Sequence, residues 1–248
     1  MSTTDSVKRR FLGAAFTILF TTIMAAPSMA DMLTFQEGVS PSAGYVVPDA
    51  DIRSGAPDAN FEGDIRWNIG NFGQLFREVA KFDISALPAG ATITSVSLTV
   101  YQNSAGSGGT QTQVDLHTLT NDFNELQVTW NSRTASSLWA TPGGDFSVPV
   151  LSSITPVGIV DGTAYTFPSS PNFITAANNA LTSDGFLRLM VKSAAEAPSS
   201  LMSFYAEDDG SPTAFHPALT ITFIPEPASL GLIVLSGGLL LWRRRSRE

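Results

Sequence analysis

The sequence predicts an all-β fold: an antiparallel β-sandwich with a jelly-roll-like arrangement and one short helix. First, apolar residues in the body of the chain recur at period two more often than at period 3.6. Second, about nine short stretches rich in β-branched and aromatic residues are separated by clusters of Gly, Pro, Asn and Ser. Third, only one stretch has helical spacing. Regularly spaced short strands with a single helix are typical of a sandwich.

The clearest strand pattern is ATITSVSLTVYQ, residues 91–102. Its residues Val96, Leu98 and Val100 share one face, whereas the serines and threonines between them share the other. Upstream, FREVAKFDIS at 76–85 alternates in the same way. The other predicted strands, in chain order, are VDLHTL (114–119), LQVTW (126–130), DFSVPV (145–150), TAYTF (163–167), GFLRLMVK (185–192), SLMSFY (200–205) and ALTITF (218–223).

The predicted helix is PNFITAANNALTSDG, residues 171–185. Here Phe173, Ala177 and Leu181 fall four residues apart on one face, with a proline near the start and a glycine near the end. The stretch SAGSGGTQ, residues 104–111, is predicted to be a flexible hairpin loop, because strand patterns resume on both sides of it.

The N-terminus has the organisation of a signal peptide, assigned to residues 1–30. The basic residues Lys8–Arg10 precede an apolar stretch at 11–24, and small residues follow up to Ala30. Cleavage is predicted after Ala30. A retained N-terminal anchor is the alternative.

The C-terminal segment 225–248 ends in an apolar run and an arginine cluster. The apolar run at 228–242 is 15 residues long, so as a helix it spans about 22 Å, against about 30 Å of hydrocarbon in a bilayer. Such a short hydrophobic helix predicts at least a transient stay in the membrane, with the arginines on the cytoplasmic side. Residues 31–224 remain as one folded domain.

The charge and the cysteine content narrow the possible partners. Residues 31–224 contain seven basic and nineteen acidic residues, a formal charge of −12, which argues against nucleic acid as a partner. The chain has no cysteine, so an exported body has neither a disulfide nor a thiolate metal site. Its stability rests on core burial, with oxygen-bound ions as a possible addition.

The sequence carries little that predicts catalysis. The two histidines, His117 and His216, lie far apart beside strand patterns and are interpreted as structural. The body has none of the G-x-S-x-G, H-E-x-x-H or P-loop spacings. The chain is therefore predicted not to be an enzyme, and a polysaccharide lyase or hydrolase is the least favoured reading.

Two acidic clusters suggest a calcium site. One lies near the start of the body and the other just before its last strand, and a sandwich often brings its terminal strands together. The candidate ligands of a structural Ca²⁺ are Asp49, Asp51, Glu207 and Asp208. The alternative is that these are solvated loop acids that keep the surface soluble.

Aromatic residues offer a second kind of site, because exposed rings stack on sugars. Trp130 ends an apolar strand pattern and is predicted to be core. Trp67 is flanked by Arg66 and Asn68, and Trp139 lies in a serine-rich connection, so both are predicted to be exposed.

The C-terminal stretch resembles a PEP-CTERM sorting signal. The motif is Pro225-Glu226-Pro227, followed by the apolar segment and by Arg243, Arg244 and Arg245. The resemblance implies recognition by a membrane-embedded exosortase and processing near the Pro-Glu-Pro step. It also implies export to the cell surface, outer envelope or extracellular matrix of a Gram-negative bacterium that makes exopolysaccharide.

The body resembles the DNRLRE type of domain, which is similar to a carbohydrate-binding module with a β-sandwich fold. Four stretches carry the likeness, at residues 49–63, 79–101, 121–133 and 203–223. Phe61 stands where that family usually has a tyrosine. Members of the family are associated with acidic polysaccharides, but the charge of this body makes a neutral glycan at least as credible a ligand.

The predicted function is that of an exported, non-catalytic surface or matrix protein that binds polysaccharide. The candidate sugar contacts are Arg53, Arg66 and Trp67, which lie in the first polar, glycine-rich region of the body. The alternative is a structural protein of the extracellular matrix or biofilm without a sugar site. A flat polar surface favours this alternative, whereas a concave face with exposed aromatic residues favours binding.

Overall fold

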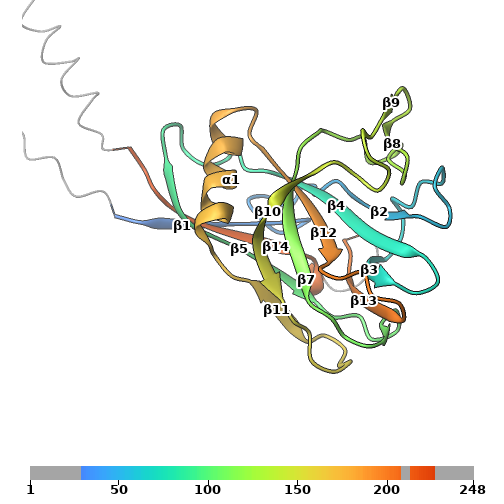
Figure 1. Cartoon of the computed structure of the whole chain (residues 1–248). Coiled ribbons are helices and arrows are strands. Elements are labelled where there is room, and N and C mark those ends of the chain that lie inside the picture. The colour runs from blue at the N-terminus through green and yellow to red at the C-terminus, as the bar shows by residue number, and fades with distance from the viewer. Residues whose placement is uncertain (1–28, 208–212, 227–248) are drawn as a thin grey trace, which may run out of the picture. The chain divides into compact units, whose positions relative to one another are not determined.

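The computed structural model describes residues 29–207 and 213–226, which form a two-layer antiparallel β-sandwich with one α-helix (Figure 1). The predicted fold class is therefore confirmed. Most of the predicted signal peptide and the sorting segment from Pro227 onward lie outside the described residues. Among the helices that are described, none has the length and the apolar character needed to cross a bilayer.

The first layer is a four-stranded sheet in the order β1-β14-β5-β11. Its members are β1 (Asp31–Gln36), β14 (Ala218–Ile224), β5 (Thr92–Tyr101) and β11 (Ala164–Phe167). The two ends of the body, β1 and β14, pair with each other directly. This pairing confirms the expectation that the terminal strands of the sandwich meet.

The second layer is an eight-stranded sheet in the order β10-β7-β12-β4-β3-β13-β6, with β2 paired to β4 beside this path. Its members are β10 (Phe146–Ile154), β7 (Val114–Leu119), β12 (Phe186–Ser193), β4 (Leu75–Asp83), β3 (Arg66–Asn71), β13 (Ser200–Tyr205), β6 (Gly108–Gly109) and β2 (Asp49–Arg53). A separate hairpin joins β8 (Ser132–Thr134) to β9 (Ser137–Leu138), and the short 3-10 helix η1 (Thr213–Phe215) precedes β14.

The main core lies between the two sheets and follows directly from the period-two pattern. Val96, Leu98 and Val100 of β5 are fully buried beside the apolar positions of β14, and the apolar positions of β12 and β13 in the other sheet belong to the same core. Alternate residues of the same strands remain partly exposed on the outer surface. One face of each sheet therefore supplies the apolar burial that holds the layers together.

A second, smaller core covers part of the opposite face of the eight-stranded sheet. There Ile52 and Met190 pack beneath Val128, Trp130 and other apolar residues of the long connection between β7 and β10. The prediction of a strand at 126–130 is wrong, because this stretch is a loop in the structure. Val128 and Trp130 point the same way because both fill this second core, and their two-residue spacing imitates a strand.

The predicted helix is confirmed as α1 (Pro171–Thr182), which packs against β5, β10 and β12 and so joins both sheets at one side of the sandwich (Figure 1). Ser170 caps its start by accepting the backbone N–H of Phe173 at 3.1 Å. On the inward side, the side chain of Asn178 accepts the N–H of Ile93 at 3.1 Å and donates to its carbonyl at 3.0 Å. These bonds fix the inward side of the helix against β5. The polar side chains on its opposite side remain exposed to solvent.

Candidate functional site

Trp67 lies in the core and not on the surface. The residue is 1% exposed in β3, and its ring belongs to the apolar cluster between the sheets. Its indole Nε1 donates a hydrogen bond to the carboxylate of Asp49. The predicted exposure of Trp67 is therefore wrong, and so is that of Trp139, whereas Trp130 is buried as predicted.

Arg53 is held by acidic and aromatic neighbours. Its Nε and Nη2 donate to Asp51 at 3.0 and 2.9 Å, and Nη2 also contacts the carboxylate of Asp64. The guanidinium lies 3.9 Å from the centre of the Phe61 ring, in a cation-π arrangement. Arg66 is more accessible, with Nε 3.9 Å from Asp64 and a side chain that is 30% exposed. Of the three predicted sugar contacts, Arg66 alone presents a substantial surface.

The inward face of β2 carries an unusual concentration of buried acids. Asp49 and Asp51 alternate with Ala50 and Ile52, which belong to the second core, so the two carboxylates point to the opposite face. Burial raises the pKa of Asp51 to about 7, although the nearby Arg53 guanidinium lowers it. Glu78 of β4 stands beside Asp51 and is fully buried. Its pKa is raised well above the usual range, first by desolvation and then by the charges of Asp49 and Asp51.

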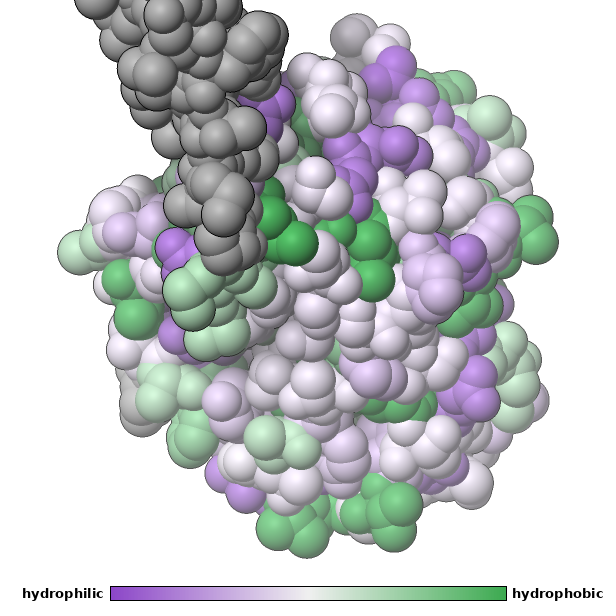
Figure 2. Space-filling model, turned by 90° about the vertical axis from the view of Figure 1, so that its left-hand side faces the viewer, coloured by the Kyte–Doolittle hydropathy of each residue, from purple (hydrophilic) through white to green (hydrophobic). Residues whose placement is uncertain are grey.

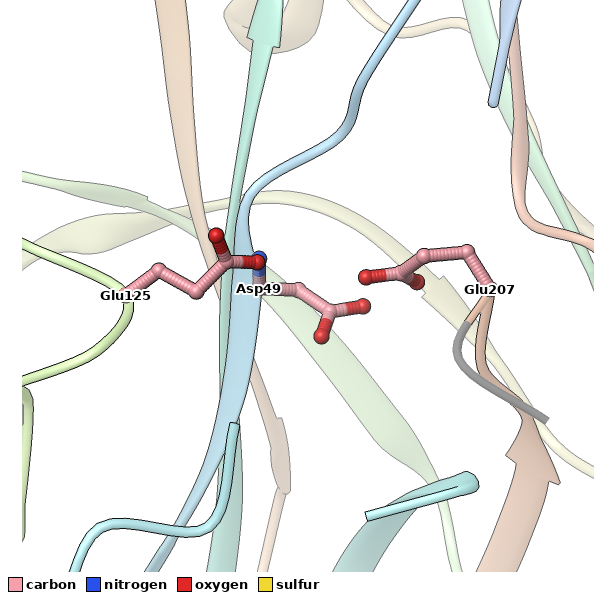
Figure 3. Close-up of side chains that lie close together, drawn as sticks. All are labelled: Asp49, Glu125 and Glu207. Carbon is pink, nitrogen blue, oxygen red and sulfur yellow. The ribbon is translucent and has the colours of Figure 1, made fainter. Parts of the chain in front are cut away.

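Three carboxylates from distant parts of the chain meet next to this acidic strand. One oxygen each of Asp49, Glu125 and Glu207 lie within 4.8 Å of one another. Figure 3 shows Glu125 and Glu207 reaching toward Asp49 from opposite sides. We call these three residues the carboxylate triad.

The triad modifies the ligand set that the sequence suggests. Asp49 and Glu207 do come together as predicted, whereas Asp51 is bound to Arg53, and Asp208 lies outside the described residues. Glu125 was not predicted. It belongs to the loop after β7, and its Oε1 accepts the backbone N–H of Asp49 at 3.0 Å, across 76 residues of sequence.

A groove with a volume of about 710 Å³ lies between α1 and the strands β7, β10 and β12. The exposed helix residues Asn172, Thr175 and Asn179 line it from one side, since spacings of three and seven place them on one face of α1. Phe186 of β12 adds an aromatic ring, and Ala176 adds apolar surface. We call this feature the α1 groove. Sequence reasoning missed it, although the polar face of the predicted helix is visible in the spacing of its asparagines.

The charged groups that line the α1 groove are held in ion pairs, one of them with Lys81 from the adjoining surface. Arg188 donates to Asp184 at 2.6 Å and to Asp122 at 2.8 Å, and Lys81 donates to Asp122 at 3.2 Å. The hydrogen bond from Arg188 lowers the pKa of Asp184 to about 2, and the bonds from Arg188 and Lys81 lower the pKa of Asp122 despite an opposing effect of burial. Both carboxylates therefore stay ionised and paired at neutral pH.

A second hollow, with a volume of about 500 Å³, adjoins the groove through the shared residue Asp122. Lys81, Glu125 and Arg133 line it, together with the loop that covers the second core. Glu125 therefore belongs both to this hollow and to the carboxylate triad.

The outward-facing residues of the four-stranded sheet are mainly serine and threonine. The strand register places Thr34, Thr220 and Ser97 in one row, and Thr99 beside Thr166 in another. The hydroxyls of Thr99 and Thr166 are 2.9 Å apart. In Figure 2, which views the side that lies at the left in Figure 1, pale residues of intermediate hydropathy fill the middle of the visible face. The outer face of this sheet is therefore rich in hydroxyl groups.

Comparison with known proteins gives one family. The sequence model of carbohydrate-binding module family 96 matches residues 45–142, which include β2 to β9 and the loop that carries Glu125. The chain thus contains a domain similar to a carbohydrate-binding module. The helix α1 lies beyond the matched residues. A search of curated proteins found no match.

Proposed function

We propose that this chain is an exported, non-catalytic protein that binds a polysaccharide in the α1 groove of its β-sandwich. The observation that carries the proposal is the groove itself. It is concave, of a size typical of ligand sites, and lined by amide and hydroxyl groups around apolar patches. The similarity of residues 45–142 to a carbohydrate-binding module supports polysaccharide binding by the chain, whereas the place of binding rests on the groove alone, because α1, β10 and β12 lie beyond the matched residues.

The charge balance of the groove favours a neutral polysaccharide. The carboxylates of Asp122 and Asp184 are held in ion pairs by Arg188 in the groove and by Lys81 in the second hollow. A polyanion would have to displace these pairs and approach a body with a formal charge of −12 over residues 31–224. A neutral sugar needs only hydrogen-bond partners and a surface for its apolar ring face, and the groove provides both.

The same ion pairs support a binding role over a catalytic one. Glycoside hydrolysis needs a carboxylic acid with a raised pKa to protonate the leaving group. In the groove the pKa values of Asp122 and Asp184 are lowered instead, because Arg188 and Lys81 hydrogen-bond to the ionised carboxylates.

The groove can be tested with a double variant, Asn172→Ala with Asn179→Ala. Both side chains are exposed, but Asn172 also donates to the carbonyl of Val150 at 3.0 Å, so the free energy of unfolding should fall by about 1 kcal/mol for Asn172→Ala and change by less than about 0.5 kcal/mol for Asn179→Ala. Loss of two amide partners should weaken binding to a neutral polysaccharide by about tenfold or more, since each hydrogen bond contributes about 1 kcal/mol. The measurement is retention of the full chain in affinity electrophoresis with neutral and acidic polysaccharides.

The matched control is Thr92→Ala with Thr94→Ala, which removes two exposed hydroxyls from β5 on the outer sheet face. This control should bind as the wild type does. If the threonine variant lost retention and the asparagine variant kept it, the sugar would lie on the outer sheet face and the groove proposal would be wrong.

A second candidate function is that of a structural matrix protein. The hydroxyl-rich outer face of the four-stranded sheet favours it, because such a surface can pack against other chains without a pocket. If no neutral or acidic polysaccharide retained the wild type, that result would support the structural function over sugar binding.

The export part of the proposal concerns the two terminal segments. The basic and apolar pattern of residues 1–30 supports secretion, and the motif at 225–248 supports sorting by an exosortase to the surface, outer envelope or matrix of a Gram-negative bacterium. We expect the protein recovered from cells to begin at Asp31 and to end near Pro225, as mass spectrometry would measure. Replacing Arg243, Arg244 and Arg245 with glutamine should leave the tail attached while N-terminal cleavage continues. An intact chain in the cytosolic fraction would contradict export.

A further inference from the structure

The carboxylate triad joins three segments that are far apart in sequence. Asp49 is the first residue of β2, Glu125 lies in the loop after β7, and Glu207 follows β13. The three carboxylate oxygens lie within 4.8 Å of one another. Ionised carboxylates at this separation repel each other strongly in a low-dielectric setting, so the arrangement needs a compensating positive charge or a proton.

Glu207 is the member that most clearly lacks such compensation. It is only 8% exposed, and its side chain points toward Asp49 (Figure 3). Within residues 29–207 and 213–226, no N–H or O–H group donates to either of its carboxylate oxygens, and no lysine or arginine forms an ion pair with it. A buried, unpartnered carboxylate aimed at two others indicates a missing ligand.

The chemistry and the spacing of the triad fit a hard cation. All three side chains offer carboxylate oxygen, the ligand atom that Ca²⁺ prefers, at distances of about 2.3–2.6 Å. Oxygens on opposite sides of one Ca²⁺ are therefore separated by about 4.6–5.2 Å, and the observed limit of 4.8 Å lets all three share a single ion. We propose that Asp49, Glu125 and Glu207 bind one Ca²⁺ that ties β2, the β7–β10 connection and the end of β13 together.

The position of this ion gives it a structural role near the sugar site. Glu125 also lines the second hollow, which adjoins the α1 groove at Asp122. Fixing Glu125 therefore fixes the loop that carries both Asp122 and Phe123, and Phe123 fills the second core. The inference does not depend on polysaccharide binding, because the ion contacts the body alone.

Trp67 supplies a direct readout, because its indole nitrogen donates to Asp49. Tb³⁺, an oxygen-binding substitute for Ca²⁺, should give luminescence when the tryptophans of the metal-stripped full chain are excited, and added Ca²⁺ should quench it by competition. A Ca²⁺ excess of about a hundredfold over the dissociation constant should also raise the melting temperature by about 5–10 °C relative to EDTA.

Glu207→Gln should weaken Tb³⁺ and Ca²⁺ binding at least about tenfold and should lose the melting shift. In EDTA, the same variant should be as stable as the wild type or more stable, because it removes a buried like charge from the triad. A variant that is less stable than the wild type in Ca²⁺ but not in EDTA has lost a cation ligand. A variant that has lost only packing is less stable in both conditions. Glu62→Gln, which makes the same chemical change outside the triad, should behave as the wild type.

Two outcomes would overturn the proposal. In one, the wild type and Glu207→Gln give equal Tb³⁺ luminescence and Ca²⁺ does not shift the melting temperature. In the other, Glu207→Gln is less stable than the wild type in EDTA by as much as in Ca²⁺. Either result would mean that the carboxylate triad does not bind Ca²⁺.

Discussion

Trp67→Ala is expected to lower the free energy of unfolding by about 3–5 kcal/mol, because it removes a large, fully buried aromatic side chain from the core between the sheets. The variant also removes the indole N–H that donates to the carboxylate of Asp49, so a buried acid loses a hydrogen-bond donor. Urea unfolding of the full chain, followed by far-UV circular dichroism, measures the change.

Two further variants separate these effects. Trp67→Phe keeps an aromatic ring and loses only the N–H donor and part of the volume, so its cost should be smaller. Leu138→Ala removes an apolar side chain that is 72% exposed and should have almost no effect on unfolding. If Trp67→Ala unfolded at the wild-type urea concentration but lost polysaccharide retention, Trp67 would be a sugar contact and its buried position in β3 would be wrong.

The period-two pattern is clearest in strands with one solvated face. In β5 and β14, apolar residues alternate with polar ones because one face meets the main core and the other meets water. The strand β2 escaped prediction because its sequence DADIR is buried on both faces, with Asp49 and Asp51 turned inward and Ala50 and Ile52 in the second core. A hydrophobicity pattern does not register a strand whose inward face is acidic.

The residues of the candidate site were also only partly predictable from the sequence. The convergence of Asp49 and Glu207 follows from the meeting of distant strands in a sandwich, whereas Glu125 comes from a loop for which the sequence predicts no partner. Trp67 was misplaced because its neighbours Arg66 and Asn68 are polar. In a strand those neighbours occupy the opposite face, so they say nothing about the exposure of the residue between them.

Arg53→Met is expected to cost about 3–5 kcal/mol of unfolding free energy, which would identify Arg53 as a structural residue in place of the sugar contact suggested by the sequence. Its guanidinium is the partner of Asp51, whose side chain is 0% exposed. Removing the arginine leaves that carboxylate buried without its cation, whereas Asp64 retains some contact with water.

A double variant tests the cause of this loss. Arg53→Met combined with Asp51→Asn removes the uncompensated charge, so it should recover most of the stability lost by Arg53→Met alone. Arg66→Met is the matched control, because its side chain is 30% exposed and its nearest acid oxygen is 3.9 Å away. That control should cost less than about 1 kcal/mol. Equal costs for the two arginine variants, with no recovery in the double variant, would show that the Arg53–Asp51 pair does not hold β2 in place.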